Sequence, residues 1–171
     1  KNTFEKLKEA FTIEDDIESL IATKRNLFND AFDHKEDLYL LDGVEDLIKE
    51  LYANGMQLVL ASSSAKVTIN RIFTRFNLHQ YFTHIVSGED FPKSKPHPAI
   101  FEHAVFLSQT PTENCIVIED STNGIIAAKA AGIYCIGYDS VHSKLQDYSK
   151  ADKVISNFNE LSFEMIKNIS V

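Results

Sequence analysis

The stretch Ile116-Val117-Ile118-Glu119-Asp120-Ser121-Thr122-Asn123-Gly124 decides the fold of this chain. Its three β-branched apolar residues indicate a strand that is buried on both faces. Two adjacent carboxylates end this strand, and an alanine-rich helical run follows the Asn-Gly pair. Charged groups are costly to bury, and in open parallel sheets ligands bind at the carboxyl ends of the strands. The stretch therefore predicts a parallel α/β sheet with a ligand site at its carboxyl edge.

The same alternation of strand and helix extends through the rest of the chain after Leu38. The apolar patterns predict strands at 57–61, 84–86, 115–118, 133–137 and 153–155. Amphipathic patterns predict helices at 43–54, 65–76, 99–107, 122–131 and 159–168. Strands that alternate with helices are typical of a parallel sheet with helices on both faces.

The first part of the chain has a different pattern. Apolar residues recur there at helical spacing, and none of the segments before residue 33 has the alternation of a strand. A polar segment, 33–37, follows these helices and is typical of a linker. We therefore predict two domains, a small helical one at 1–35 and an α/β one at 36–171.

Composition limits the classes of partner. The 171 residues carry a net charge of −8 and are 44% hydrophobic, which is enough for a normal core but gives no basic patch. We therefore expect no nucleic-acid partner and no membrane partner. The two cysteines, Cys115 and Cys135, lie in apolar strand patterns. They are expected to be buried thiols in a reducing compartment, so we expect a cytoplasmic protein.

A cluster of hydroxyl groups follows the strand predicted at 57–61. Ser62, Ser63 and Ser64 lie between this strand and the next helix. Hydroxyl groups and the first amide groups of a helix together form an anion site, so the cluster predicts phosphate contact, by Ser62 above all. The alternative is that a serine only caps the helix that begins near Ala65.

A lysine is held in the rigid segment Ser94-Lys95-Pro96-His97-Pro98. Proline restricts the residue before it to extended conformations, and Pro98 suits the first turn of the helix from Ala99. A lysine presented from a fixed loop can neutralise the charge of a phosphate. The alternative for Lys95 is an ordinary surface loop.

The two acids at the end of the strand 115–118 suit a hard divalent cation. Mg²⁺ prefers oxygen ligands and usually takes one or two carboxylates from a protein. Glu119 and Asp120 point in opposite directions if the backbone is still extended, so one would ligate Mg²⁺ directly and the other through water. The alternative is a solvated strand end at which Asp120 caps the next helix.

The order of these motifs resembles the haloacid dehalogenase superfamily, and most closely its branch of β-phosphoglucomutase and sugar-phosphate phosphatases. The resemblance implies a Rossmann-like core with a small helical cap, of which residues 1–32 would be a part. It implies catalytic and phosphate-binding roles for Ser62 and Lys95, with Ser63 as a further phosphate contact. Glu119 and Asp120 correspond to the metal acids. The resemblance also places a basic substrate residue of the cap at Arg25.

The chain departs from this family in one essential motif. Members begin with a strand that ends in Asp-x-Asp-Gly, in which the first aspartate is the nucleophile and the second is the general acid and base. The 171 residues contain no Asp-x-Asp sequence. In the family that strand lies between the strands that correspond here to 57–61 and 115–118. Three explanations remain: a piece of a longer enzyme, a non-catalytic remnant, or a second chain that supplies the strand.

We therefore expect a Mg²⁺-dependent mutase or phosphatase that acts on a small phosphorylated sugar or a similar phosphomonoester. Its reaction would proceed through an aspartyl phosphate whose nucleophile lies outside these residues. The chain alone is then expected to be inactive. The alternative function is a non-catalytic module that binds phosphate or metal.

Overall fold

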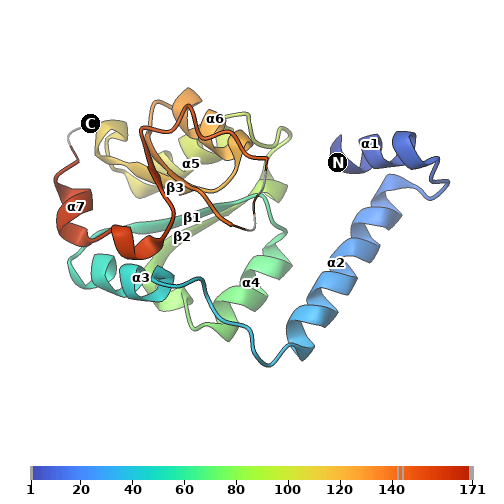
Figure 1. Ribbon diagram of the computed structural model, residues 1–171, viewed down its shortest axis with the longest axis horizontal. Coiled ribbons are helices and arrows are strands. Elements are labelled where there is room, and N and C mark those ends of the chain that lie inside the picture. The colour runs from blue at the N-terminus through green and yellow to red at the C-terminus, as the bar shows by residue number, and fades with distance from the viewer. Residues whose placement is uncertain (1, 142, 144, 170–171) are drawn as a thin grey trace. The chain divides into compact units, whose positions relative to one another are not determined.

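A computed structural model describes residues 2–141, 143 and 145–169, and the chain divides into two compact units between Tyr39 and Leu40 (Figure 1). The first unit is helical. It contains α1 (Asn2–Phe11) and α2 (Ile17–His34), and the carboxylate of Asp16 caps α2 by accepting a hydrogen bond of 2.9 Å from the Ser19 N–H. Capping of this kind satisfies one of the amide groups that a helix start leaves without a partner.

The second unit has the predicted α/β alternation. Its strands are β1 (Leu58–Ser62), β2 (Phe82–Ser87), β3 (Ile116–Glu119), β4 (Tyr134–Tyr138) and β5 (Lys153–Ile155). Its helices are α3 (Val44–Ala53), α4 (Lys66–Arg75), α5 (Ala99–Ser108), α6 (Thr122–Ala130) and α7 (Phe163–Lys167). Every strand pairing in the structure is parallel, so the predicted fold class is confirmed.

The last predicted helix is wrong in its extent. Instead of one helix over 159–168, the structure has a 3₁₀ turn at Phe158–Glu160 and then α7. Asn157 and Glu160 form a capping box that closes the turn on itself, and the Ser162 hydroxyl caps α7 by accepting a hydrogen bond from the Met165 N–H. Two successive caps stop one helix from running through this segment.

The strands form two separate sheets. One sheet has the order β1-β2, with Leu60 opposite Ile85, and the other has the order β3-β4-β5, with Val117 opposite Cys135. Within the described residues, no backbone pairing joins β1 to β3. Each of these two strands therefore has a strand partner on one edge only.

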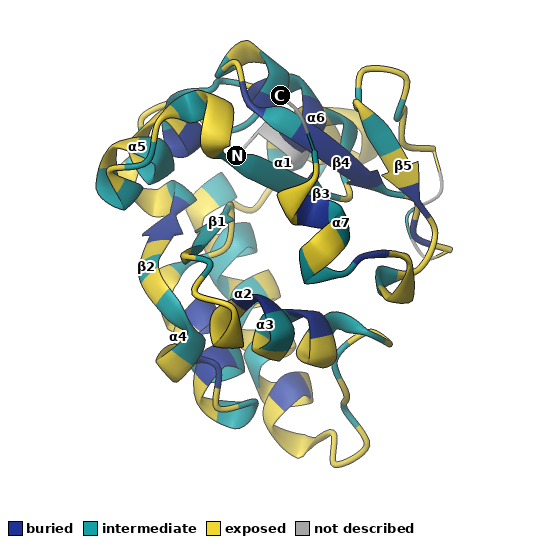
Figure 2. Ribbon diagram, turned by 90° about the vertical axis from the view of Figure 1, so that its left-hand side faces the viewer, coloured by how far each residue is buried: buried dark blue, intermediate teal, exposed yellow. Residues whose placement is uncertain are grey.

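Helices nevertheless pack against both sheets, and each helical layer contacts residues of the two sheets together (Figure 2). On one face, Val59 of β1 and Val117 of β3 pack into the same cluster as the buried residues of α5 and α6. On the other face, Leu58 and Ile116 join a cluster that includes Leu47 of α3 and residues of α7. Because side chains alternate along a strand, each of β1 and β3 contributes to both layers.

An apolar cavity of about 790 Å³ lies between β1 and β3. We call it the strand slot. Both strands line it, together with residues of α3, α5 and α7. A sheet edge presents a row of backbone N–H and C=O groups that require partners, and two such edges flank this slot.

Candidate phosphoryl-transfer site

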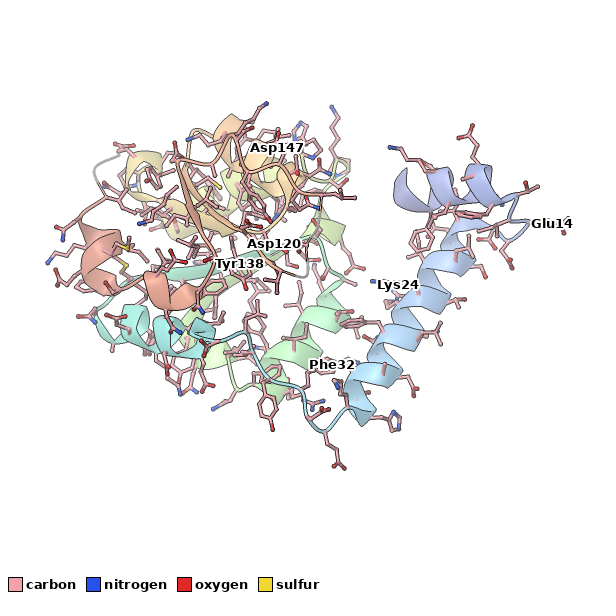
Figure 3. The ribbon with its side chains drawn as sticks, in the orientation of Figure 1. Glu14, Lys24, Phe32, Asp120, Tyr138 and Asp147 are labelled. Carbon is pink, nitrogen blue, oxygen red and sulfur yellow. The ribbon has the colours of Figure 1, made fainter. Side chains whose placement is uncertain are left out.

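A pocket of about 440 Å³ opens at the carboxyl ends of β1, β3 and β4. The three polar motifs of the sequence meet in its wall: the serines 62–64, Lys95, and the acid pair 119–120. Tyr138 and Ser140, which the sequence analysis did not single out, also line the pocket, and Figure 3 shows Asp120 and Tyr138 in the α/β unit. Arg25 lies in α2 of the first unit, and its role toward substrate stays a prediction.

Lys95 is held from three directions. Its side chain is only 9% exposed, and its ammonium group forms an ion pair with the Glu119 carboxylate. The ammonium also donates a hydrogen bond of 3.1 Å to the Ala61 carbonyl and lies 4.5 Å from the centroid of the Phe101 ring. An ammonium group has three N–H donors, and two of them have these acceptors. The ammonium group also lines the pocket.

Glu119 turns inward rather than toward solvent. Its side chain is 10% exposed, and while one carboxylate oxygen pairs with Lys95, the other accepts hydrogen bonds from the Ser121 N–H (3.1 Å) and hydroxyl (3.0 Å). Gly124 makes room for it, because a Cβ atom at that position would lie 2.0 Å from the carboxylate carbon of Glu119. Both Glu119 oxygens are thus used within the protein.

Asp120 has the opposite environment. It follows the last residue of β3, is exposed, and lines the pocket. The alternative reading of Asp120 as a helix cap is wrong, because the Ser121 hydroxyl caps α6 by accepting a hydrogen bond of 3.1 Å from the Gly124 N–H. The sequence left open which acid would ligate a cation directly, and this geometry favours Asp120.

The donor set fits part of a Mg²⁺ shell. No group of three or more His, Cys, Asp or Glu side chains among the described residues is arranged to hold a metal ion. Mg²⁺ commonly uses one or two carboxylates, with waters and substrate phosphate as its other ligands. Asp120 can supply one carboxylate from this chain. The neighbouring Glu119 carboxylate is already paired with the Lys95 ammonium group and the Ser121 N–H.

The serine loop after β1 is braced by the end of β2. The buried Ser87 hydroxyl donates a hydrogen bond of 2.8 Å to the Ser64 carbonyl, and it accepts one of 3.2 Å from the Glu89 N–H. The Ser62 hydroxyl in turn accepts a hydrogen bond of 3.1 Å from the Ser64 N–H. The loop therefore has a fixed shape before any ligand binds.

The alternative interpretation of the serine cluster, as the cap of the helix that begins near Ala65, is wrong. No serine caps this helix: its N-cap residue is Ala65, and the Lys66 N–H donates a hydrogen bond of 2.8 Å to the Glu89 carboxylate. The first backbone N–H of α4 is thus already hydrogen-bonded to the Glu89 side chain. Sequence reasoning missed Ser87 and Glu89, although they form a further polar cluster directly after a predicted strand.

The two cysteines form no disulfide. Cys135 is buried in β4, where burial raises the pKa of its thiol to about 12, so that the thiol stays protonated. Cys115 is half-buried, and burial raises its pKa as well. Both thiols are therefore core groups rather than nucleophiles of the site. Among the described helices, none is both long and apolar enough to cross a membrane.

A family model described as haloacid dehalogenase-like hydrolase matches residues 1–138. The chain belongs to this family. It is 34% identical over 125 residues to a bifunctional riboflavin kinase/FMN phosphatase of Arabidopsis thaliana, covering 72% of this chain and 33% of that protein. The chain thus spans only a third of the length of that relative.

Two solved structures show the same fold. One is a mutant of CbbY from Rhodobacter sphaeroides in complex with xylulose-(1,5)bisphosphate, with a TM-score of 0.68 and 30% identity over 71% of this chain and 56% of that one. The other is β-phosphoglucomutase from Clostridium difficile, with a TM-score of 0.64 and 30% identity over 75% of this chain and 55% of that one.

Proposed function

We propose that this chain is part of a Mg²⁺-dependent phosphotransferase or phosphatase, with an aspartate nucleophile on a strand outside the 171 residues. That strand would fill the strand slot, in parallel with β1 and β3. The slot carries the proposal: it is apolar, it lies between two strand edges, and its carboxyl end opens toward Lys95 and Asp120.

The residues of the pocket suit the steps of such a reaction. Lys95, fixed by Glu119 and the Ala61 carbonyl, would neutralise charge on the transferring phosphoryl group. Ser62 and Ser63 would donate hydrogen bonds to its oxygens from the braced loop. Asp120 would hold Mg²⁺, with Glu119 keeping the adjacent lysine in place. When bound, Mg²⁺ stabilises the negative charge that develops in phosphoryl transfer.

The strand in the slot would place the side-chain carboxylate of the first aspartate of Asp-x-Asp-Gly at the mouth of the pocket. This carboxylate would attack the phosphorus atom while the bond from phosphorus to the substrate oxygen breaks. The second aspartate of Asp-x-Asp-Gly would give its proton to the leaving oxygen, so that the products are an alcohol and an aspartyl phosphate. Water or a second hydroxyl group would then accept the phosphoryl group. The first outcome is a phosphatase and the second is a mutase, and the chain does not distinguish them.

The substrate class rests on relatives. CbbY is described with a sugar bisphosphate and another relative is a β-phosphoglucomutase, which supports a small phosphorylated sugar or a similar phosphomonoester. Arg25 would hold a distal polar group of that substrate from the helical unit, which we propose is part of a cap. In that case Arg25→Ala raises KM for sugar phosphates more than KM for p-nitrophenyl phosphate. Equal effects would remove Arg25 from the site.

The second candidate is a non-catalytic module that binds phosphate or metal. It is favoured by the absence of an Asp-x-Asp sequence from the 171 residues, since this leaves the chain without the family nucleophile. In either case the unpaired thiols support a reducing, cytoplasmic location.

One comparison separates the two candidates. The 171-residue chain is assayed with Mg²⁺ and p-nitrophenyl phosphate, alone and co-produced with a strand segment that ends in Asp-x-Asp-Gly. We expect turnover only with the segment, and its loss when EDTA removes the cation or when the first aspartate of the segment is changed to asparagine. A complemented protein that binds phosphate but releases none from any phosphomonoester would favour the module.

A further inference from the structure

The segment after β4 returns to the start of α6 and contacts the backbone around Asp120. The Tyr148 hydroxyl donates a hydrogen bond of 3.2 Å to the Asp120 carbonyl. The Gln146 side-chain carbonyl accepts one of 2.8 Å from the Thr122 N–H, and the Asp147 N–H donates one of 2.7 Å to the Thr122 hydroxyl. We call residues 146–148 the strap, and Figure 3 labels Asp120 and Asp147.

The strap and Glu119 hold opposite ends of a single peptide unit. The carbonyl between Asp120 and Ser121 accepts from Tyr148, while the N–H of the same unit donates to the Glu119 carboxylate at 3.1 Å. A trans peptide is planar, and its C=O and N–H point in opposite directions. Partners at both ends therefore fix the plane of this unit, and with it the backbone torsion next to the Asp120 side chain.

The ring of Tyr148 keeps the hydroxyl in position. It packs over Gly137 of β4, where a Cβ atom would lie 3.0 Å from a ring carbon, and it belongs to the cluster of apolar residues beneath α5 and α6. Removing the hydroxyl alone would leave this packing unchanged. The hydrogen bond to Asp120 and the packing of the ring can thus be tested separately.

We propose that Tyr148 is a positioning residue for the cation site, which presets the Asp120 carboxylate through the backbone. This inference rests on the proposed function in two respects, that Asp120 ligates a divalent cation and that a strand fills the strand slot. An exposed carboxylate on a freely rotating backbone loses conformational entropy when it binds a cation. The strap removes that loss before binding, and groups behind a metal ligand commonly change metal affinity by about 10-fold or more.

The test is direct binding of Mn²⁺, as a spectroscopic substitute for Mg²⁺, to the complemented protein in which the strand slot is filled. Tyr148→Phe is compared with Tyr52→Phe, which removes the same atom from an exposed tyrosine of α3. We expect Tyr148→Phe to raise the Kd for Mn²⁺ by about 3- to 10-fold, since the hydrogen bond to the Asp120 carbonyl is lost. The control should leave Kd unchanged, and both melting temperatures should stay near that of the wild type.

Gln146→Ala is the second variant, because it truncates an exposed side chain and so spares the core. Gln146→Ala should also raise the Kd for Mn²⁺. If Tyr148→Phe does not fold, the Kd of Gln146→Ala tests the inference by itself. Unchanged Mn²⁺ affinity in the folded strap variants, or an equal change in the Tyr52→Phe control, would overturn the inference. A wild type that binds Mn²⁺ but hydrolyses no phosphomonoester would instead overturn the proposed function, while the comparison of Kd values still stands.

Discussion

At the scale of single residues, the ammonium group of Lys95 makes two kinds of contact, and a substitution to alanine removes both. The group keeps a nearly buried carboxylate neutralised and also faces the pocket. Lys95→Ala should lower kcat of the complemented enzyme by a factor on the order of 10²–10³, since it removes one electrostatic contact to the transferring group. The matched control is Lys93→Ala, two residues earlier on the same loop and exposed. A kcat within tenfold of the wild type would contradict this role.

At Gly124, a substitution to alanine should destabilise the protein, although Gly→Ala within a helix usually stabilises it. Glycine in a helix normally costs about 1 kcal/mol relative to alanine, so Gly→Ala commonly stabilises. Here the new Cβ atom would lie 2.0–2.2 Å from the carboxylate of Glu119, which Lys95 and Ser121 hold in place. Gly124→Ala should therefore destabilise the protein, by about 2 kcal/mol.

Denaturant unfolding of the complemented protein measures this change. The control is Asn123→Ala, an exposed substitution one residue earlier in the same helix. If Gly124→Ala proved more stable than the wild type, the Glu119 side chain would have to be mobile rather than fixed.

At the scale of elements, Asp152 ties three of them together. Its carboxylate accepts hydrogen bonds from the Lys129 ammonium of α6 (2.6 and 2.8 Å) and from the Cys135 N–H of β4 (2.7 Å), immediately before β5. Burial pushes the pKa of Asp152 up, but these hydrogen bonds outweigh it and hold the pKa below its ordinary value of 3.8. The pKa of Asp152 is thus lower in the folded chain than in the unfolded one.

The lowered pKa of Asp152 determines how the free energy of unfolding changes with pH. A carboxyl with a lowered folded pKa contributes stability above its unfolded pKa, and this is lost as pH falls through the folded value. The advantage of the wild type over Asp152→Asn should therefore be largest near pH 7 and shrink below about pH 4. Urea unfolding at both pH values tests this, with Asp46→Asn on the exposed face of α3 as the control. A constant difference would mean that Asp152 contributes no pH-dependent stability.

The sequence predicts the elements well where the pattern is local. The five strands lie within a few residues of their predicted positions, because buried strands show as apolar runs between turn residues. The split of the last helix was missed, since it depends on the capping contacts of Asn157 and Ser162. The motifs also predict the serine loop, Lys95 and the acid pair of the pocket wall, but not Tyr138 and Ser140.

The contacts behind those side chains could not be predicted. The role of Gly124 depends on the inward turn of Glu119, and the cap of α4 comes from Glu89, 23 residues away. The first contact depends on the direction of one side chain and the second joins residues that are distant in sequence, so neither has a periodic signal. The Tyr148 hydroxyl is a further case, 28 positions from its acceptor.

At the scale of the whole α/β unit, we expect the strand slot to limit the free energy of unfolding. The apolar layers on both sides of the sheets run continuously past it, so filling it joins one core, while leaving it open exposes apolar surface and two strand edges. Edges of this kind pair readily with other chains. A single strand in the slot would thus supply both the proposed nucleophile and partners for the two strand edges.

The 171-residue chain alone should consequently be poorly stable, aggregate or bind an apolar dye, and neither hydrolyse phosphomonoesters nor form an aspartyl phosphate. A segment in which about five residues rich in valine and isoleucine precede Asp-x-Asp-Gly should raise its melting temperature, because a ligand that binds only the folded state stabilises it. The control is the same segment with a central proline, which removes a donor needed in the middle of a sheet. Dye binding, melting and Mg²⁺-dependent turnover are compared for the three samples. A monomer that melts sharply and turns over substrate without any segment would mean that another residue of the chain is the nucleophile.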